Sequence, residues 1–160
     1  MIRTIAMLTF WGLAAPVAAL IGFPWTFITG DIRLLYRMFM FGAFNGVRLT
    51  GVRVQTVGLD QLDPARTYIF MSNHVSNLDP PVLFPVLPGQ CSALLKKELM
   101  RIPLLGTAMR MAKFVPVGRG NVREAAQASV AAAAAALRSG LHIVIFAEGT
   151  RSKEIGRAHV

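Results

Sequence analysis

A histidine and an aspartate five positions apart are the side chains in this sequence best suited to acid–base chemistry. They are His74 and Asp79, within the segment FMSNHVSNLDPP at residues 70–81. A histidine can take a proton from a hydroxyl near neutral pH, especially when a carboxylate fixes its tautomer and stabilises the imidazolium. The spacing alone fits a second interpretation equally well. Asp79 could only cap a helix, and His74 could be a hydrogen-bonded residue of the loop.

The pair can act together only if the chain turns between its two members. On one continuous helix their side chains would point about 140° apart. The contact becomes possible if His74 lies in a loop and Asp79 caps the next helix, and the two prolines after Asp79 indicate such a helix start. No G-x-S-x-G nucleophile motif accompanies them. The histidine would therefore activate an alcohol substrate directly.

Two polar loops carry groups that could bind a phosphate. Arg119 stands between two glycines, and Glu148, Gly149, Thr150 and Arg151 follow an apolar run. A guanidinium, a hydroxyl and backbone N–H groups are suitable phosphate ligands. Each arginine alone is better explained as a solvated loop charge, but together, at strand ends, they favour a phosphate site. No metal site is expected, because His74 and Asp79 lack further histidines or cysteines at ligand spacing.

Short apolar runs separated by helical patterns predict an α/β domain whose strands position these loops. Residues 52–57 alternate as in a half-buried strand. Residues 67–71 are expected to form a short buried strand that delivers Asn73 and His74 to its carboxyl end. A helix is expected from Asp79 to about Leu87. Further strands are expected at 92–96, 114–117 and 141–146, and further helices at 104–112 and 121–139. The loops after three strands would then meet at one edge of the sheet.

After Arg3 comes an uncharged stretch, residues 5–30, which is long enough to cross a bilayer of about 30 Å. Gly22-Phe23-Pro24 is expected to interrupt it, and Trp11 and Trp25 suit a membrane interface. Residues 31–44 show an amphipathic helix pattern with two arginines four positions apart. We favour two membrane-associated helices over one clean span. A cleaved signal peptide fits less well, because no small-x-small site follows a short apolar core.

The sequence has 17 Lys and Arg against 8 Asp and Glu, a net charge of +9. Such an excess suits an anionic membrane or a phosphorylated substrate, although a solvated basic surface gives the same count. Nucleic acid is not expected, since the chain lacks a Lys/Arg block and an aromatic stacking pattern. The single cysteine, Cys91, is expected to be a small core residue, and because no disulfide within the chain is possible, a reducing compartment is expected.

Three motifs occur in order: NHVSNLD at 73–79, KKEL through FVPVGR at 96–119, and FAEGTRS at 146–152. Together they resemble the lysophospholipid acyltransferase family, and in particular its bacterial 1-acyl-sn-glycerol-3-phosphate acyltransferases, over residues 52–153. The resemblance implies an α/β fold with a mixed central sheet flanked by helices, preceded by N-terminal membrane-associated helices. The family often has an acidic residue where Gly118 stands here.

The resemblance also implies a reaction and its residues. An acyl chain would pass from a thioester to the free hydroxyl of 1-acyl-glycerol-3-phosphate, giving phosphatidic acid. His74 would be the general base and Asp79 its orienting partner. The substrate-binding residues would be Asn73, Arg119, Glu148, Gly149, Thr150 and Arg151. No cofactor is implied, because acyl-CoA or acyl-acyl carrier protein is a co-substrate; the other partners would be the lysophospholipid acceptor and an anionic membrane.

We expect three segments: a membrane-associated helical segment at 1–48, an acyltransferase catalytic domain at 49–153, and residues 154–160, which match a translated sequencing adapter. The last motif of the family, an apolar strand with a proline, is absent after residue 152, so the catalytic domain is expected to be incomplete. More positive charge follows the uncharged stretch than precedes it, which predicts the cytoplasmic face of the inner (plasma) membrane. Two alternatives stay open: another lysolipid or an amino-acid-based lipid as acceptor, and a non-catalytic protein that binds anionic membranes.

Overall fold

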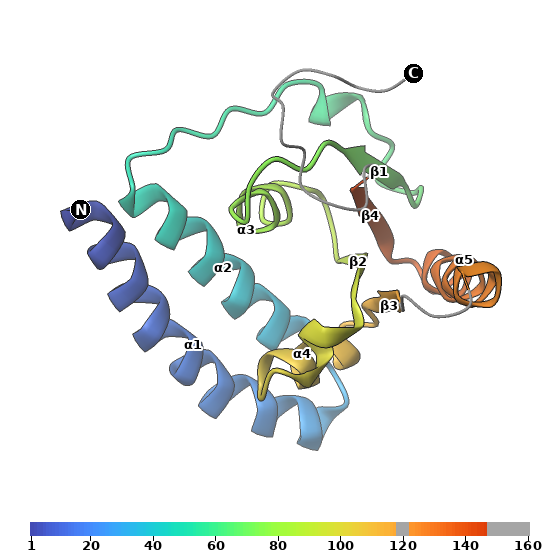
Figure 1. The fold of residues 1–160 in the computed structure, drawn as a ribbon, viewed down its shortest axis with the longest axis horizontal. Coiled ribbons are helices and arrows are strands. Elements are labelled where there is room, and N and C mark those ends of the chain that lie inside the picture. Colours follow the sequence, from blue (N-terminus) through green and yellow to red (C-terminus); the bar gives the residue numbers. More distant parts are fainter. Residues whose placement is uncertain (118–121, 147–160) are drawn as a thin grey trace. The chain divides into compact units, whose positions relative to one another are not determined.

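The structure is a computed structural model that describes residues 1–117 and 122–146 (Figure 1). It divides into two compact units. The first holds residues 1–61 and 80–87, and the second holds residues 62–79, 88–117 and 122–146.

The first unit is built on two helices, α1 (Ile2–Thr29) and α2 (Arg33–Leu49), which pack side by side as a hairpin (Figure 1). Gly30 ends α1 with a φ of 71°, a left-handed conformation that glycine adopts without strain. The expected interruption at 22–24 is wrong, because α1 runs through Pro24 without a break. Gly22 and Phe23 are buried. We attribute the continuity to this packing, which outweighs the local cost of the proline.

Glycines in both helices allow the close approach of α1 and α2. A side chain at Gly22 would collide with Leu35, which is 1% exposed, and a side chain at Gly46 would collide with the Trp11 ring. The Trp11 indole N–H also donates to the carbonyl oxygen of Gly42 at 3.1 Å. The hairpin is therefore held by two large side chains seated over glycines of the opposite helix.

The second unit contains a sheet of four strands in the order β1-β4-β2-β3 (Figure 1). They are β1 (Ile69–Ser72), β2 (Cys91–Lys96), β3 (Val115–Val117) and β4 (His142–Phe146). All three strand pairs are parallel, so the expectation of a mixed sheet is wrong for the described strands. Helical segments separate consecutive strands, and connections of this length return the chain to the same end of the sheet.

The remaining helices of the chain lie before and between the strands. α3 (Asp79–Leu83) is shorter than expected, because Pro85 cannot donate an N–H bond and disfavours helical geometry at the residue before it. η2 (Lys97–Arg101) and α4 (Leu105–Met111) follow β2, and η1 (Leu59–Gln61) precedes β1. α5 (Val122–Arg138) packs against β2, β3 and β4. In β4, Ile143 and Val144 are fully buried.

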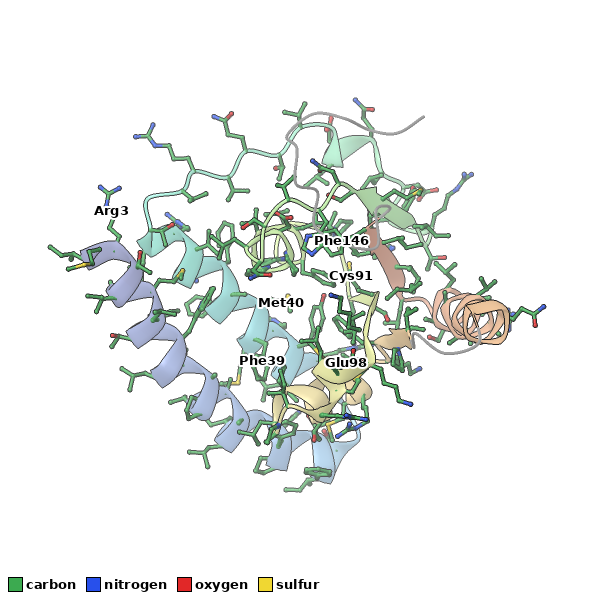
Figure 2. The ribbon with its side chains drawn as sticks, viewed as in Figure 1. Arg3, Phe39, Met40, Cys91, Glu98 and Phe146 are labelled. Carbon is green, nitrogen blue, oxygen red and sulfur yellow. The ribbon has the colours of Figure 1, made fainter. Side chains whose placement is uncertain are left out.

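The strand expected at residues 52–57 does not form. An alternating pattern stabilises a strand only when one face is covered, and here Val52 is 43% exposed and Val57 is 97% exposed. The prediction for Cys91 is confirmed, since its side chain is buried in β2 (Figure 2).

Candidate active site

The carboxyl end of β1 brings the chain to the candidate site. Ser72 is the last residue of β1 and pairs with Phe146, the last residue of β4. In parallel sheets the carboxyl ends of the strands share one edge, where ligands are usually bound. Asn73 follows directly, exposed to solvent, and its carbonyl oxygen accepts a bond from the Ser72 hydroxyl at 3.0 Å. His74 therefore starts from a fixed position at this edge.

His74 and Asp79 contact each other. His74 Nδ1 lies 2.9 Å from Asp79 Oδ2, and the two side chains are 20% and 22% exposed. The same carboxylate oxygen accepts the backbone N–H groups of Val75 and Ser76, each at 2.8 Å. The Asp79 N–H in turn donates to the Ser76 carbonyl at 3.2 Å. The loop thus folds back on itself, so that a residue at the start of α3 reaches the histidine five positions earlier.

Hydrogen bonding keeps the Asp79 carboxylate ionised. Burial raises its pKa, but the bonds from the Ser76 amide, His74 and the Val75 amide outweigh burial, so the net pKa lies below its ordinary value of 3.8. An ionised carboxylate can only accept hydrogen bonds. The neutral His74 ring must then carry its proton on Nδ1, which leaves the lone pair of Nε2 as the proton acceptor. This is the arrangement required of a general base.

An aromatic residue that was not predicted as a site residue, Phe146, contacts His74. The Phe146 ring stacks on the imidazole with centroids 4.4 Å apart and an interplanar angle of 28°. Phe146 is the last apolar residue of the expected strand at 141–146. A position at the end of an expected strand indicates a residue near the ligand-binding edge of the sheet. Only the order of the strands, however, shows that β4 lies beside β1.

The other predicted site residues, Arg119, Glu148, Gly149, Thr150 and Arg151, lie outside the described residues. The strands before them are described. β4 is the neighbour of β1, whereas β3 is separated from β1 by two strands. At about 4.8 Å per strand, the carboxyl ends of β1 and β3 lie roughly 14 Å apart. Within residues 1–117 and 122–146, no three His, Cys, Asp or Glu residues form a group that could hold a metal ion.

Comparison with known proteins identifies the family. The sequence model of the family described as Acyltransferase matches residues 53–159, which is more than half of the chain. The chain therefore belongs to the acyltransferase family. Both His74 and Asp79 fall inside the matched segment.

Curated relatives carry a more specific name. Human 1-acyl-sn-glycerol-3-phosphate acyltransferase alpha is 32% identical over 104 residues, 65% of this chain and 37% of the relative. The 1-acyl-sn-glycerol-3-phosphate acyltransferase of Borreliella burgdorferi is 30% identical over 105 residues, 66% of this chain and 42% of the relative. That of Limnanthes douglasii is 27% identical over 144 residues, 90% of this chain and 48% of the relative.

The chain spans less than half the length of each of these three relatives. No solved structure matches it.

Proposed function

We propose that the chain carries the catalytic histidine of an enzyme that acylates 1-acyl-glycerol-3-phosphate to phosphatidic acid. The observation that supports this most strongly is the contact of 2.9 Å between His74 Nδ1 and Asp79 Oδ2, within the segment matched by the acyltransferase family. The relatives named as 1-acyl-sn-glycerol-3-phosphate acyltransferases supply the substrate class.

In the proposed reaction, His74 Nε2 takes the proton from the free glycerol hydroxyl as its oxygen attacks the carbonyl carbon of an acyl thioester. A carbon–oxygen ester bond forms and the carbon–sulfur bond breaks. The leaving thiolate then takes the proton from the imidazolium, which restores the neutral base. Asp79 stabilises the imidazolium in between, since its carboxylate stays ionised.

We propose that no metal or prosthetic group takes part. A thiol is a good leaving group, and the hydroxyl needs only a base to become nucleophilic, so His74 and Asp79 supply the chemistry that this step requires. The donor is acyl-CoA or acyl-acyl carrier protein. A chelator is therefore expected to leave turnover unchanged.

The acceptor phosphate is proposed to bind beyond β3 and β4, through Arg119 and through Glu148, Gly149, Thr150 and Arg151, with Asn73 beside His74. Two guanidinium groups match the charge and geometry of a phosphate. The carboxyl ends of β1 and β4 are adjacent, which favours an acceptor bound near His74.

The hairpin of α1 and α2 is proposed to attach the enzyme to the cytoplasmic face of the membrane. Among the described residues, one helix, Ile2–Thr29, is long and apolar enough to cross a bilayer, and only 22% of its most apolar stretch is buried. Charged residues stand at both ends of the hairpin: Arg3 bonds the Thr50 carbonyl, and Asp31 lies 3.9 Å from Arg33 at the link. Because charges are costly in hydrocarbon, we favour a hairpin lying in the interface over one that inserts its link.

Acyl transfer to a panel of acceptors tests the proposed function. The protein is incubated with an acyl thioester and with one of three acceptors: lysophosphatidic acid, a lysolipid without a free phosphate, or an amino-acid-based lipid. Phosphatidic acid should be the main product, and Arg151→Ala should reduce turnover of phosphate acceptors selectively. If the enzyme prefers another acceptor, 1-acyl-glycerol-3-phosphate is not its substrate and the proposal is wrong. Vesicle binding without thioester consumption would favour the non-catalytic alternative.

A further inference from the structure

We propose that Phe146 is a positioning residue that fixes the plane of the His74 imidazole and so aims Nε2 at the acceptor hydroxyl. The inference rests on the proposed role of His74 as the general base.

The two contacts of the imidazole constrain different motions. The bond from Nδ1 to Asp79 Oδ2 acts at one edge of the ring, and a single bond leaves the ring free to rock about that edge. Phe146 covers one face of the ring, with centroids 4.4 Å apart and planes 28° from parallel. This face contact restricts the rocking motion. Together the two contacts fix the direction in which Nε2 points. A base that takes a proton from a small hydroxyl group requires such a fixed direction.

The strand pairing explains why Phe146 is held in place. Ser72 pairs with Phe146 in the parallel register of β1 and β4, and His74 follows only two residues after Ser72. The backbone at Phe146 is therefore tied to the strand that delivers the histidine. A ring carried on this backbone moves with the histidine rather than independently of it.

A second histidine in the same unit provides an internal comparison. His142 contacts Phe70 at 5.6 Å with an angle of 64°, and Tyr68 at 5.9 Å with an angle of 32°. Its Nδ1 accepts the Tyr68 backbone N–H at 3.0 Å, and it is only 9% exposed. His142 is thus a buried structural histidine, and its contact with Phe70 is longer and more edge-on. The closest and flattest histidine stack in the described residues is on the proposed base.

The test compares three variants of the protein. Phe146→Leu removes the ring but keeps an apolar side chain of similar reach. Phe146→Tyr keeps the ring and should rescue the activity. Phe70→Leu is the matched control, because it removes an aromatic ring from a histidine that the proposed reaction does not use.

Phe146→Leu should lower kcat about ten- to hundredfold, the range expected when a reacting group is misplaced by about 1 Å or less, with KM for both substrates unchanged. Phe146→Tyr and Phe70→Leu should keep the wild-type kcat. NMR of the imidazole protons gives a readout independent of activity. The His74 ring protons lie over an aromatic face and should lose their upfield ring-current shift in Phe146→Leu, while the Nδ1 proton bound to Asp79 persists.

The outcomes separate this inference from the proposed function. If the wild type transfers no acyl group, or His74→Ala keeps turnover, the proposed function fails. If the wild type is active and His74→Ala is not, but Phe146→Leu keeps the wild-type kcat or raises KM alone, the positioning role is wrong. Should Phe146→Leu unfold, Phe146→Met offers the same test with a more adaptable side chain. Unfolding of both would show that Phe146 acts through packing, and would overturn the proposal.

Discussion

At the residue scale, one carboxylate oxygen organises the candidate site. Asp79 Oδ2 accepts from the His74 ring and from the backbone N–H groups of Val75 and Ser76. The two amides belong to residues before Asp79, so these bonds fix the loop that precedes α3 and are not those of a helix cap. The ring bond has the geometry proposed for a base with its orienting partner. The loop amides, and not the bonds of a helix cap, therefore hold the carboxylate beside His74.

Asp79→Asn is expected to lower kcat by about 10²- to 10⁴-fold, because a neutral amide stabilises the imidazolium poorly and can favour the wrong tautomer. The control is Asp63→Asn. Asp63 is also a turn carboxylate, which accepts the Ala65 N–H at 2.9 Å and lies 3.3 Å from Arg66, but it has no histidine partner among these contacts. Steady-state kinetics should separate the two variants. Equal activity in both would contradict an orienting role for Asp79.

His142 is expected to make the stability of the folded protein depend on pH, in a pH range separate from that of Asp79. Burial lowers its pKa below the ordinary value of 6.5, and its unprotonated Nδ1 accepts the Tyr68 N–H. Below pH 6.5 the unfolded chain binds this proton more readily than the folded one, so stability should fall as the pH drops from 7 towards 5.

His142→Gln, which cannot titrate, should show a smaller decrease over that range in urea unfolding experiments. The pKa of Asp79 is depressed below 3.8, so its contribution is present above that pH and lost only at more acidic values. The two windows therefore do not overlap. An unchanged pH dependence in His142→Gln would rule out His142 as the source.

At the element scale, the hairpin depends on glycines that leave room for large side chains of the opposite helix. Helix propensity alone disfavours a glycine in the middle of a helix, by roughly 0.5–1 kcal/mol relative to alanine. Gly46 sits in α2 under the Trp11 ring, whereas Gly12 in α1 has no atom within 4 Å of its potential Cβ. The two glycines therefore have opposite expected responses to the same substitution.

Gly46→Ala should destabilise the hairpin by about 1–3 kcal/mol, because the added methyl group collides with Trp11 and the helices must move apart. Gly12→Ala should leave stability unchanged or increase it by up to about 1 kcal/mol. Thermal unfolding followed by circular dichroism in detergent, with Trp fluorescence as a local probe, measures both. Destabilisation of equal size would mean that the Trp11 contact does not hold the hairpin.

At the scale of the whole molecule, apolar surface and positive charge are combined in one chain. The net charge is +9, and α1 exposes many large apolar side chains. They include Leu13 at 68%, Leu20 at 76%, Phe27 at 70% and Ile28 at 85%. Burial in lipid and attraction to anionic headgroups would both contribute to membrane binding, and salt distinguishes them, because it screens charge but not apolar contact.

The chain is expected to bind anionic vesicles more strongly than neutral ones, with the difference shrinking from 0.05 to about 0.5 M salt as the Debye length falls below about 5 Å. A fraction of the binding should resist salt and disappear when residues 1–48 are removed. Vesicle flotation measures both fractions. Full release by salt would show that charge alone attaches the protein and would contradict a membrane role for the hairpin.

The sequence alone predicted most local structure, because the signals for it lie within a few residues. Hydrophobic runs placed β1, β2, β3 and β4 within about two residues. Two local predictions failed where packing decided the outcome. Pro24 did not break α1, and residues 52–57 formed no strand, since neither a covering face nor a partner stabilised their alternation.

The sequence by itself determined the candidate acid–base pair and the α/β class, while only the tertiary structure decided how distant segments meet. Strand order and direction depend on pairings between residues far apart in the chain, which no local pattern encodes. That is why the sheet is parallel in its described strands, and why Phe146 stacks on a histidine 72 positions earlier. The contact of His74 with Asp79 depended on both sequence and tertiary structure. The sequence indicated the turn, but only the folded chain shows the two loop amides that hold the carboxylate.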